Sequence, residues 1–307
     1  MSEKTQVIDE FWLKIIAFVS MAFDHIGLFL MLYSASSTEA FAIGNIFRIV
    51  GRLAFPLFLF FLSEGLKHTT NRKAYLFRLF IMWLGIALFQ TVIYSYYRIV
   101  NNHDVLCELG SSMGAQAFTD LLLCALFVCL LEHENKKVRF LSALPALYIV
   151  LSYVLDVLDQ YGVKINLYFP IYLRASYSLF GFLIFLGFYY AYRLTDIWVK
   201  KGLQLEGREL EEYRSSPTYR RLVNMISATA LLVVTLLMWG ISYLNWHFDV
   251  FESPNTKIQN YCLLDCLLIM MYSGKRGYDK KWWRIFEYAF YPLHIAIIAM
   301  IFTLIFA

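Results

Sequence analysis

An acidic residue and a histidine stand side by side in an apolar stretch near the start of the chain. The stretch Phe11–Tyr33 is long enough to cross a bilayer, yet it carries Asp24 and His25 near its middle. Charged groups inside a membrane span cost about 2.5–3.5 kcal/mol each, so such residues are expected to face the protein interior and to serve a function. His25 is a candidate general base, because the ordinary pKa of imidazole lies near physiological pH.

Further ionisable residues are expected at the depth of this pair. Arg48 and Arg52 are four residues apart in the second apolar stretch and therefore share one helix face, and His294 lies in the last stretch. At 1.5 Å per residue, Arg52 and His294 reach the same mid-bilayer depth as the Asp24–His25 pair. Arginine keeps its charge, so Asp24 is the expected partner of Arg52. The arginines could also stabilise negative charge that develops on a substrate oxygen.

Simpler roles remain open for these residues. The Asp24–Arg52 pair alone would pin two helices together, with His25 as an ordinary core histidine. His294 would serve as a second base, as an orienting group or as a packing residue. Two arginines on one face exceed what a single pin requires, so the layer is interpreted as a catalytic site made of Asp24, His25, Arg52 and His294.

The composition places the chain among integral membrane proteins. Of its 307 residues, 60% are hydrophobic and 16% are charged, whereas soluble domains have about 25% charged residues. One all-α bundle covering residues 1–307 is therefore expected. About nine apolar runs predict transmembrane helices: Phe11–Tyr33, Ile43–Leu66, Ala74–Tyr97, Gln116–Leu131, Val138–Leu158, Arg174–Tyr192, Leu222–Leu244, Ile258–Tyr272 and Trp283–Phe306.

Lysine and arginine collect in alternate loops. The loops rich in them follow the second, fourth, sixth and eighth runs, and the intervening loops are poor in them. By the positive-inside rule, this pattern predicts a cytoplasmic N-terminus and an outer C-terminus. The longest basic loop, residues 195–219, is expected on the cytoplasmic side, either as an interfacial helix or as a solvated connector.

Basic residues gather at the cytoplasmic ends of the predicted helices. They would suit a phosphate-rich donor such as a coenzyme A ester, although membrane topology alone would also place them there. Glu64 and His68 lie beside them, toward the inner end of the second run. The candidates for donor binding are Lys14, Arg48, Glu64, His68, Arg72, Lys73, Arg78, Lys275 and Arg276.

Three blocks of the sequence are shared with a known family. FDHIG lies in the first run, GRLAFPLFLFFLSEGLKHTTNRKAYLFRL covers the second and third, and YSGKRGYDKKWWRIFEYAFYPLHIAII lies at the end. These blocks resemble the TraX family, named for the acetylase that modifies the N-terminus of F-type pilin. Lys14 and His25, with ten residues between them, also resemble a pair in transmembrane acyltransferases, which more often carry arginine at the first position.

The resemblance implies a membrane-embedded acyltransferase that uses acetyl-CoA or another acyl-CoA. His25 would act as the base toward an acceptor amine or hydroxyl, and the donor would arrive from the cytoplasm. The acceptor would be a protein N-terminus, a glycan or a lipid-linked sugar, met at the membrane or at its outer face. No serine or cysteine is paired with a histidine by motif, so direct transfer is expected.

Two other functions stay open. A transporter of a small anionic or proton-coupled solute would also use buried arginine and histidine, although transporters commonly show internal repeats and none is visible here. A non-catalytic assembly factor would use the polar residues for structure only. The expected partners are membrane lipid, the acyl-CoA and the unknown acceptor. No nucleic acid is expected, and no metal, because the five cysteines lack ligand spacing and are interpreted as packing residues.

Overall fold

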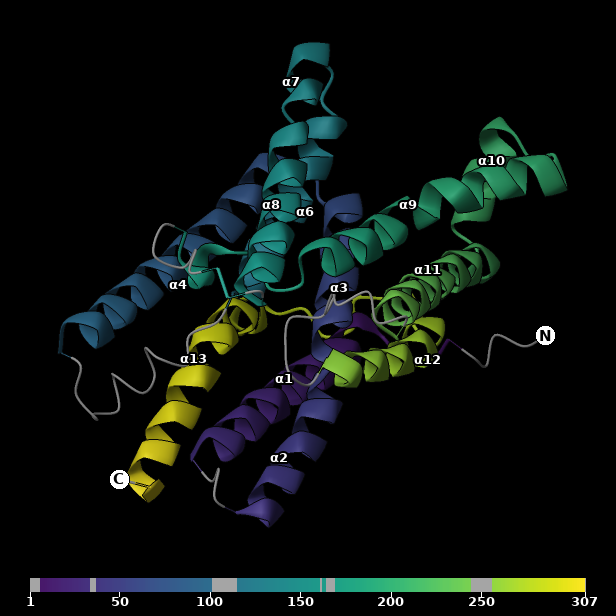
Figure 1. The fold of residues 1–307 in the computed structure, drawn as a ribbon. Coiled ribbons are helices and arrows are strands. Elements are labelled where there is room, and N and C mark those ends of the chain that lie inside the picture. Colours follow the sequence, from purple (N-terminus) through teal and green to yellow (C-terminus); the bar gives the residue numbers. More distant parts are fainter. Residues whose placement is uncertain are drawn as a thin grey trace.

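The chain folds into a bundle of helices in the computed structural model (Figure 1). The structure describes residues 6–33, 37–100, 115–160, 162–163, 169–243 and 256–306, and within them it has isolated bridges but no strand. The α-class prediction is confirmed. The helices are α1 (Glu10–Tyr33), α2 (Thr38–Gly51), α3 (Ala54–His68), α4 (Arg72–Val100), α6 (Ala117–Leu131), α7 (Lys136–Phe140), α8 (Ala143–Gln160), η3 (Ile171–Leu173), α9 (Ser178–Leu203), α10 (Gly207–Arg214), α11 (Pro217–Tyr243), η4 (Thr256–Leu264), α12 (Asp265–Met270) and α13 (Lys281–Phe306).

Seven helical segments of the described chain are long and apolar enough to cross a membrane. Five of them correspond to α1, α4, α9, α11 and α13. The other two are Thr38–His68, which contains α2 and α3, and Lys136–Asp159, which contains α7 and most of α8. The other two predicted spans correspond to the shorter apolar helices Ala117–Leu131 and Gln259–Met270. The chain is therefore a multi-pass membrane protein, and the count of nine crossings stays a prediction.

The second predicted span, Ile43–Leu66, is not one continuous helix. α2 ends at Gly51 and α3 begins at Ala54, with Arg52 at the break. The cause is Pro56, which has no N–H to donate to the carbonyl of Arg52, four residues earlier, and whose ring crowds that carbonyl. The break therefore falls at the arginine that the sequence singles out.

α1 and α2 approach each other closely because glycines lie between them. A Cβ on Gly27 would lie 2.5 Å from the carbonyl oxygen of Gly44, and one on Gly51 would lie 2.6 Å from Asp24 Oδ1. Small residues of this kind let helix backbones approach within membranes. The approach brings Asp24 directly against α2, which carries the first of the two arginines.

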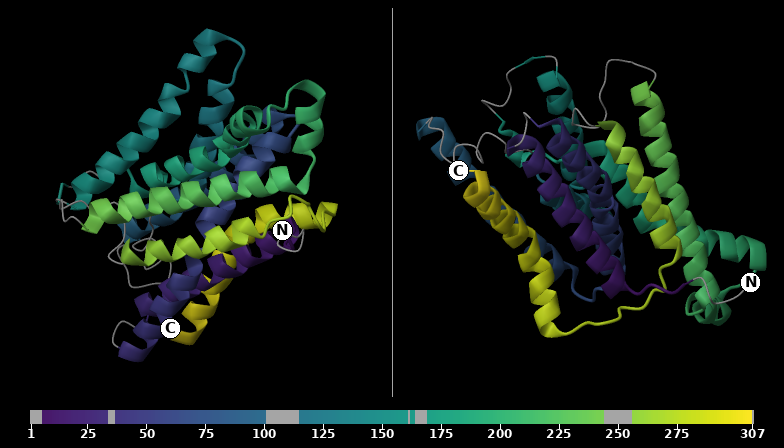
Figure 2. Two further views of the ribbon diagram at one scale, coloured as in Figure 1. Left: turned by 90° about the vertical axis from the view of Figure 1, so that its right-hand side faces the viewer. Right: turned by 90° about the horizontal axis from the view of Figure 1, so that it is seen from below.

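α1 and α13 run in the same direction. Lys14 donates to Glu287 near the start of both helices, and the ring centroids of Phe29 and Phe302 lie 5.6 Å apart near their ends. In the right-hand view of Figure 2, α10 and the loop before α13 lie at one end of the bundle and the last turns of α13 at the other. Parallel first and last spans require an odd number of crossings, which fits both seven and nine. The cytoplasmic N-terminus stays a prediction.

Residues 195–219 are largely helical. α9 continues to Leu203, α10 spans Gly207–Arg214, and α11 begins at Pro217. Leu210 of α10 is buried, while most of its charged residues are exposed. The segment thus contains a short helix between two long ones, and its place in the membrane interface stays a prediction.

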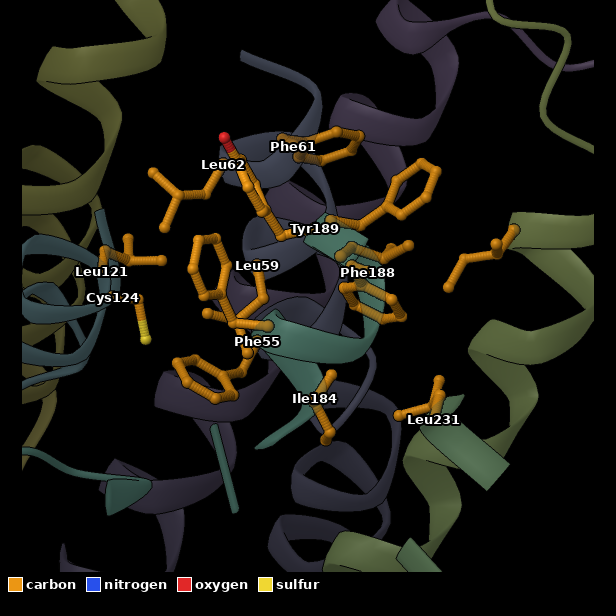
Figure 3. Close-up of a cluster of buried hydrophobic side chains, with 14 of the residues drawn as sticks. Phe55, Leu59, Phe61, Leu62, Leu121, Cys124, Ile184, Phe188, Tyr189 and Leu231 are labelled. Carbon is orange, nitrogen blue, oxygen red and sulfur yellow. The ribbon is translucent and has the colours of Figure 1, made fainter. Parts of the chain in front are cut away.

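α3 occupies the centre of the bundle. Eleven of its 15 residues are buried, and it packs against α9, α1 and α6. Figure 3 shows Phe55 of α3 in one hydrophobic cluster with Leu121 of α6 and Phe188 of α9. Four cysteines are free thiols that are buried or half-buried in the bundle: Cys124, Cys129, Cys262 and Cys266. The remaining one, Cys107, lies outside the described residues.

Candidate active site

Asp24 lies between two arginines, Arg48 in α2 and Arg52 just after the end of that helix. Arg52 donates to Asp24 Oδ1, and Arg48 Nη1 lies 3.7 Å from Oδ2. The side chains of Asp24, Arg48 and Arg52 are 17%, 12% and 11% exposed. The ion pair expected from the sequence is present. Two guanidinium groups against one carboxylate leave the group with one net positive charge.

His25 is held at one ring nitrogen by two acceptors. Its Nδ1 lies 2.9 Å from the carbonyl oxygen of Met21 and 3.1 Å from Nε2 of His294, whose own Nδ1 lies 2.8 Å from the carbonyl oxygen of Phe290. A carbonyl oxygen only accepts, so these contacts assign the proton of each neutral ring to Nδ1. The Nε2 of His25 is then unprotonated, which is the state that a general base requires.

His294 therefore has the geometry of an orienting residue. It is 6% exposed, and the ring of Phe290 stacks on it at a centroid distance of 5.0 Å. Because the Nδ1–H of His294 donates to a carbonyl, its Nε2 can accept a hydrogen bond from the Nδ1–H of His25 and so fix the orientation of that ring. The structure thus brings together every residue of the predicted mid-bilayer group. We call this group the polar layer; it consists of Asp24, His25, Arg48, Arg52 and His294.

The polar layer borders a cavity of about 880 Å³. Asp24, His25 and the two arginines line it, together with residues of α4, α6, α8 and α13. At one end the cavity reaches Glu287, near the start of α13, and at the other it reaches Gln116, just before α6. The reactive side chains therefore line a cavity large enough for small-molecule chemistry.

Gln259 belongs to this site but carries no sequence signal. It lies in η4, is 4% exposed, lines the cavity and has its Oε1 3.3 Å from Arg52 Nη1. Arginine only donates, so the amide oxygen must face Arg52. A single glutamine in a segment without a motif does not stand out in the sequence as a site residue.

Replacing Gln259 is expected to weaken the site by releasing Arg52. A hydrogen bond to a charged group contributes about 1.5–3 kcal/mol, so Gln259→Leu should lower the site's turnover at least tenfold with little change in donor KM. Gln259→Glu keeps an acceptor oxygen for Arg52 and should retain most of the turnover. Steady-state kinetics of the two variants check this, and equal activity of Gln259→Leu and wild type would contradict it.

The irregular segment Arg174–Tyr177 lies before α9, and its last two residues, Ser176 and Tyr177, line the cavity. Arg174 is fully buried and donates to Asp156 at 2.9 Å and to Asp159 at 2.5 Å. Asp120 accepts from the backbone N–H of Ser176 and of Tyr177, at 2.7 and 3.2 Å. Non-helical backbone at membrane depth is tolerated where it lines a cavity. α9 thus begins at Ser178, four residues later than the predicted span.

Lys14 is surrounded by carboxylates. Its Nζ lies 2.8 Å from Glu10 and 2.9 Å from Glu287. Its side chain is 19% exposed. Two acidic partners already balance its charge, so a donor phosphate would have to displace one of them. The structure therefore ties Lys14 to the α1–α13 contact and leaves its donor-binding role without support.

Glu64 also lies away from the surface where a donor would arrive. It is 4% exposed and accepts from Arg220 at 2.8 Å and from Tyr192 at 2.9 Å. His68 Nε2 is 3.7 Å from the same carboxylate, and its side chain is 58% exposed. Glu64 thus connects α3, α9 and α11, which is a structural role, whereas His68 remains accessible at the end of α3.

Glu64→Ala is expected to destabilise the bundle. It leaves the guanidinium of Arg220 buried without its carboxylate, and breaking a buried ion pair on one side costs about 3–5 kcal/mol. Thermal unfolding in detergent should show a clear drop in Tm. Glu39→Ala is the matched control, because Glu39 is exposed at the start of α2. A Tm for Glu64→Ala equal to that of the control would contradict the structural role.

The remaining donor candidates lie at one end of the bundle. Arg72 donates to Glu132 at 2.8 Å and to Tyr189 at 3.1 Å. Partial burial raises the pKa of Glu132, but hydrogen bonds from Tyr189 and Arg72 outweigh this effect and lower it, so the pair stays charged. Four further candidates are exposed: Lys73, Arg78, Lys275 and Arg276.

The two basic groups at this end are brought together through Arg220. A Cβ on Gly274 would lie 3.0 Å from the Arg220 side chain, and Arg220 pairs with Glu64, near the end of α3. The turn after α3 and the loop before α13 are therefore neighbours, although more than 200 residues separate them in the chain. The role of these basic residues in donor binding stays a prediction.

A comparison with known proteins found a relative that matches part of the chain. The probable fimbrial assembly protein FimC, serogroup H1, of Dichelobacter nodosus is 41% identical over 69 residues, which are 22% of this chain and 26% of that protein. The alignment thus spans about a quarter of that relative. No solved structure matches the chain.

A sequence model of one family covers most of the chain. The matched residues, 10–204, contain Asp24, His25, Arg48 and Arg52, whereas Gln259 and the last of the three blocks, with His294, lie beyond them. The family is described as TraX protein. Since the match extends over more than half of its length, the chain belongs to the TraX family.

Proposed function

We propose that the protein is an acyltransferase of a bacterial cytoplasmic membrane that transfers an acetyl group from acetyl-CoA to an acceptor at the membrane or its outer face. The observation that carries the proposal is the imidazole of His25, which is held at Nδ1 and lines the cavity beside Asp24 and two arginines. Membership of the TraX family supports it. The FimC relative is named as a probable fimbrial assembly protein, which adds a context of fimbria assembly.

The reaction is a direct transfer. His25 Nε2 takes the proton of the acceptor N–H or O–H as the acceptor lone pair attacks the thioester carbonyl carbon. The C–S bond then breaks, and the coenzyme A sulfur leaves with the proton returned by His25. The products are the acetylated acceptor and free coenzyme A, so no other reactant is required. His294 keeps the ring oriented through Nδ1.

The net positive charge of the polar layer suits this chemistry. A tetrahedral intermediate places negative charge on the former carbonyl oxygen, and preorganised donors in a water-poor site stabilise such charge strongly. Arg52 is occupied by Asp24 and Gln259. Arg48 lies 3.7 Å from the carboxylate, which is longer than a hydrogen bond. It is therefore the guanidinium that can more easily turn toward a substrate oxygen.

The donor is expected to enter from the end where the exposed basic residues lie. Lys73, Arg78, Lys275 and Arg276 are exposed there and can bind phosphate groups. The cavity extends from Glu287, near that end of α13, to the polar layer. Lys14 and Glu64 are not included in the donor site, because both are engaged in ion pairs.

The test is transfer of label from radiolabelled acetyl-CoA by the purified protein in a membrane extract. The expected result is label in an extract component, released with one equivalent of free coenzyme A. Protein that neither binds, hydrolyses nor transfers from any acyl-CoA would exclude the proposal. Solute uptake into proteoliposomes with no transfer would favour the transporter instead.

A further inference from the structure

Two rows of residues both line the cavity and are exposed on the outside of the bundle. On α4 they are Ile81, Gly85 and Phe89, spaced four residues apart on one helix face. On α13 they include Leu293 and Ala296. Ile81, Phe89 and Leu293 are 48%, 54% and 52% exposed. Residues that face both spaces mark the edges of an opening, so the cavity opens sideways between α4 and α13.

The opening lies inside the membrane-spanning part of both helices. Ile81 and Phe89 are more than two helical turns from either end of α4, and Leu293 is more than three turns from either end of α13. α4 packs on α6 and α13 packs on α1. Figure 1 and the right-hand view of Figure 2 place α4 and α13 at the same side of the bundle. A molecule that enters here comes from the hydrocarbon core and not from water.

From this geometry we propose that the side opening takes the hydrocarbon chain of a lipid-anchored acceptor, whose head reaches the polar layer. That the bound lipid is an acceptor rests on the proposed transfer function, whereas binding of its hydrocarbon chain in the opening does not. Its edges are aliphatic or aromatic, and the inner wall continues with Phe118 and Leu121. A hydrocarbon chain has no desolvation cost on moving from lipid to this wall, because both are equally apolar.

The other acceptor classes fit the opening less well. An α-helix with its side chains is 10–12 Å wide, so about 880 Å³ would hold only about 8–11 Å of its length. A free glycan has no apolar part to contact the apolar edges of the opening, whereas a lipid-linked sugar has a hydrocarbon chain. Of the protein N-terminus, the glycan and the lipid-linked sugar, the lipid-linked sugar is the class that matches the apolar side opening.

The test uses the full-length protein in proteoliposomes with a phosphatidylcholine that carries a photoactivatable diazirine in one acyl chain. After irradiation, mass spectrometry is expected to find lipid adducts on Phe118 and Leu121 inside the cavity, besides those on the outer surface. Gly85→Trp should lower the inner adducts at least fivefold, because a side chain at Gly85 meets nothing within 4 Å and can fill the opening. Gly240→Trp on α11 is the matched control, since a side chain there also meets nothing within 4 Å.

Two results would overturn the proposal. One is adducts confined to outer residues such as Val92, which is 66% exposed and does not line the cavity. The other is inner adducts that a membrane-spanning peptide with a photoactivatable N-terminus gives and the lipid does not. Crosslinking does not require turnover, so either result is distinct from a failure of acyl transfer.

Discussion

His25→Ala is expected to lower acyl transfer by about 100- to 10,000-fold, the range that a positioned general base contributes. The reason is geometric: the substitution removes the imidazole that lines the cavity, while the ion pair of Asp24 and Arg52 stays in place. The initial rate of label transfer from acetyl-CoA measures the effect. The Tm of the variant should stay close to that of wild type.

The control for this substitution is His133→Ala. His133 is exposed in the turn after α6, away from the polar layer, so its removal should leave the rate unchanged. Full transfer by His25→Ala would show that the polar layer is structural, as the assembly-factor hypothesis holds. If His25→Ala loses both transfer and folding, His25→Gln separates the two effects, because glutamine keeps the approximate volume of the ring but supplies no base.

Arg52→Met is expected to cost stability as well as activity. It leaves Asp24 buried between α1 and α2 without its main partner, and removing one side of a buried ion pair costs about 3–5 kcal/mol. The thermal midpoint in detergent should fall clearly. Arg193→Met is the control with no expected effect, because Arg193 is exposed on α9.

A double variant separates the two roles of the ion pair. Asp24→Leu/Arg52→Met replaces both charges with apolar groups, and such replacements are often neutral or stabilising. It should regain the stability lost in Arg52→Met, yet transfer little label, because Arg48 keeps its charge but loses the Asp24 carboxylate that holds its guanidinium in place. A double variant that is both stable and active would contradict the catalytic role of the pair.

The polar layer could be predicted because each member carries an unambiguous signal. A charge inside an apolar run is conspicuous, and 1.5 Å of rise per residue sets the depth of Asp24 and Arg52 without knowledge of the packing. The parallel arrangement of α1 and α13 then brings His294 to His25. Fold class and depth therefore follow from hydropathy and helix geometry alone.

Other parts of the site depend on contacts that no local pattern reveals. Gln259 acts on Arg52 across 207 residues, and it stands in a segment that reads as an ordinary apolar run. Glu64 is a surface candidate by position, but Arg220 of a distant helix draws it inside. The break after Gly51 was also missed, because hydropathy defines the apolar run Ile43–Leu66 without regard to Pro56 in its middle, which interrupts helical hydrogen bonding.

The most direct measurement of the central claim is chemical rescue of His25→Gly by imidazole. Imidazole can enter the cavity and supply the missing base, so label transfer from acetyl-CoA should be absent without it and should rise in proportion to its concentration. His133→Gly should transfer at the wild-type rate at every imidazole concentration. Transfer by His25→Gly at the wild-type rate without imidazole would show that His25 is not the base.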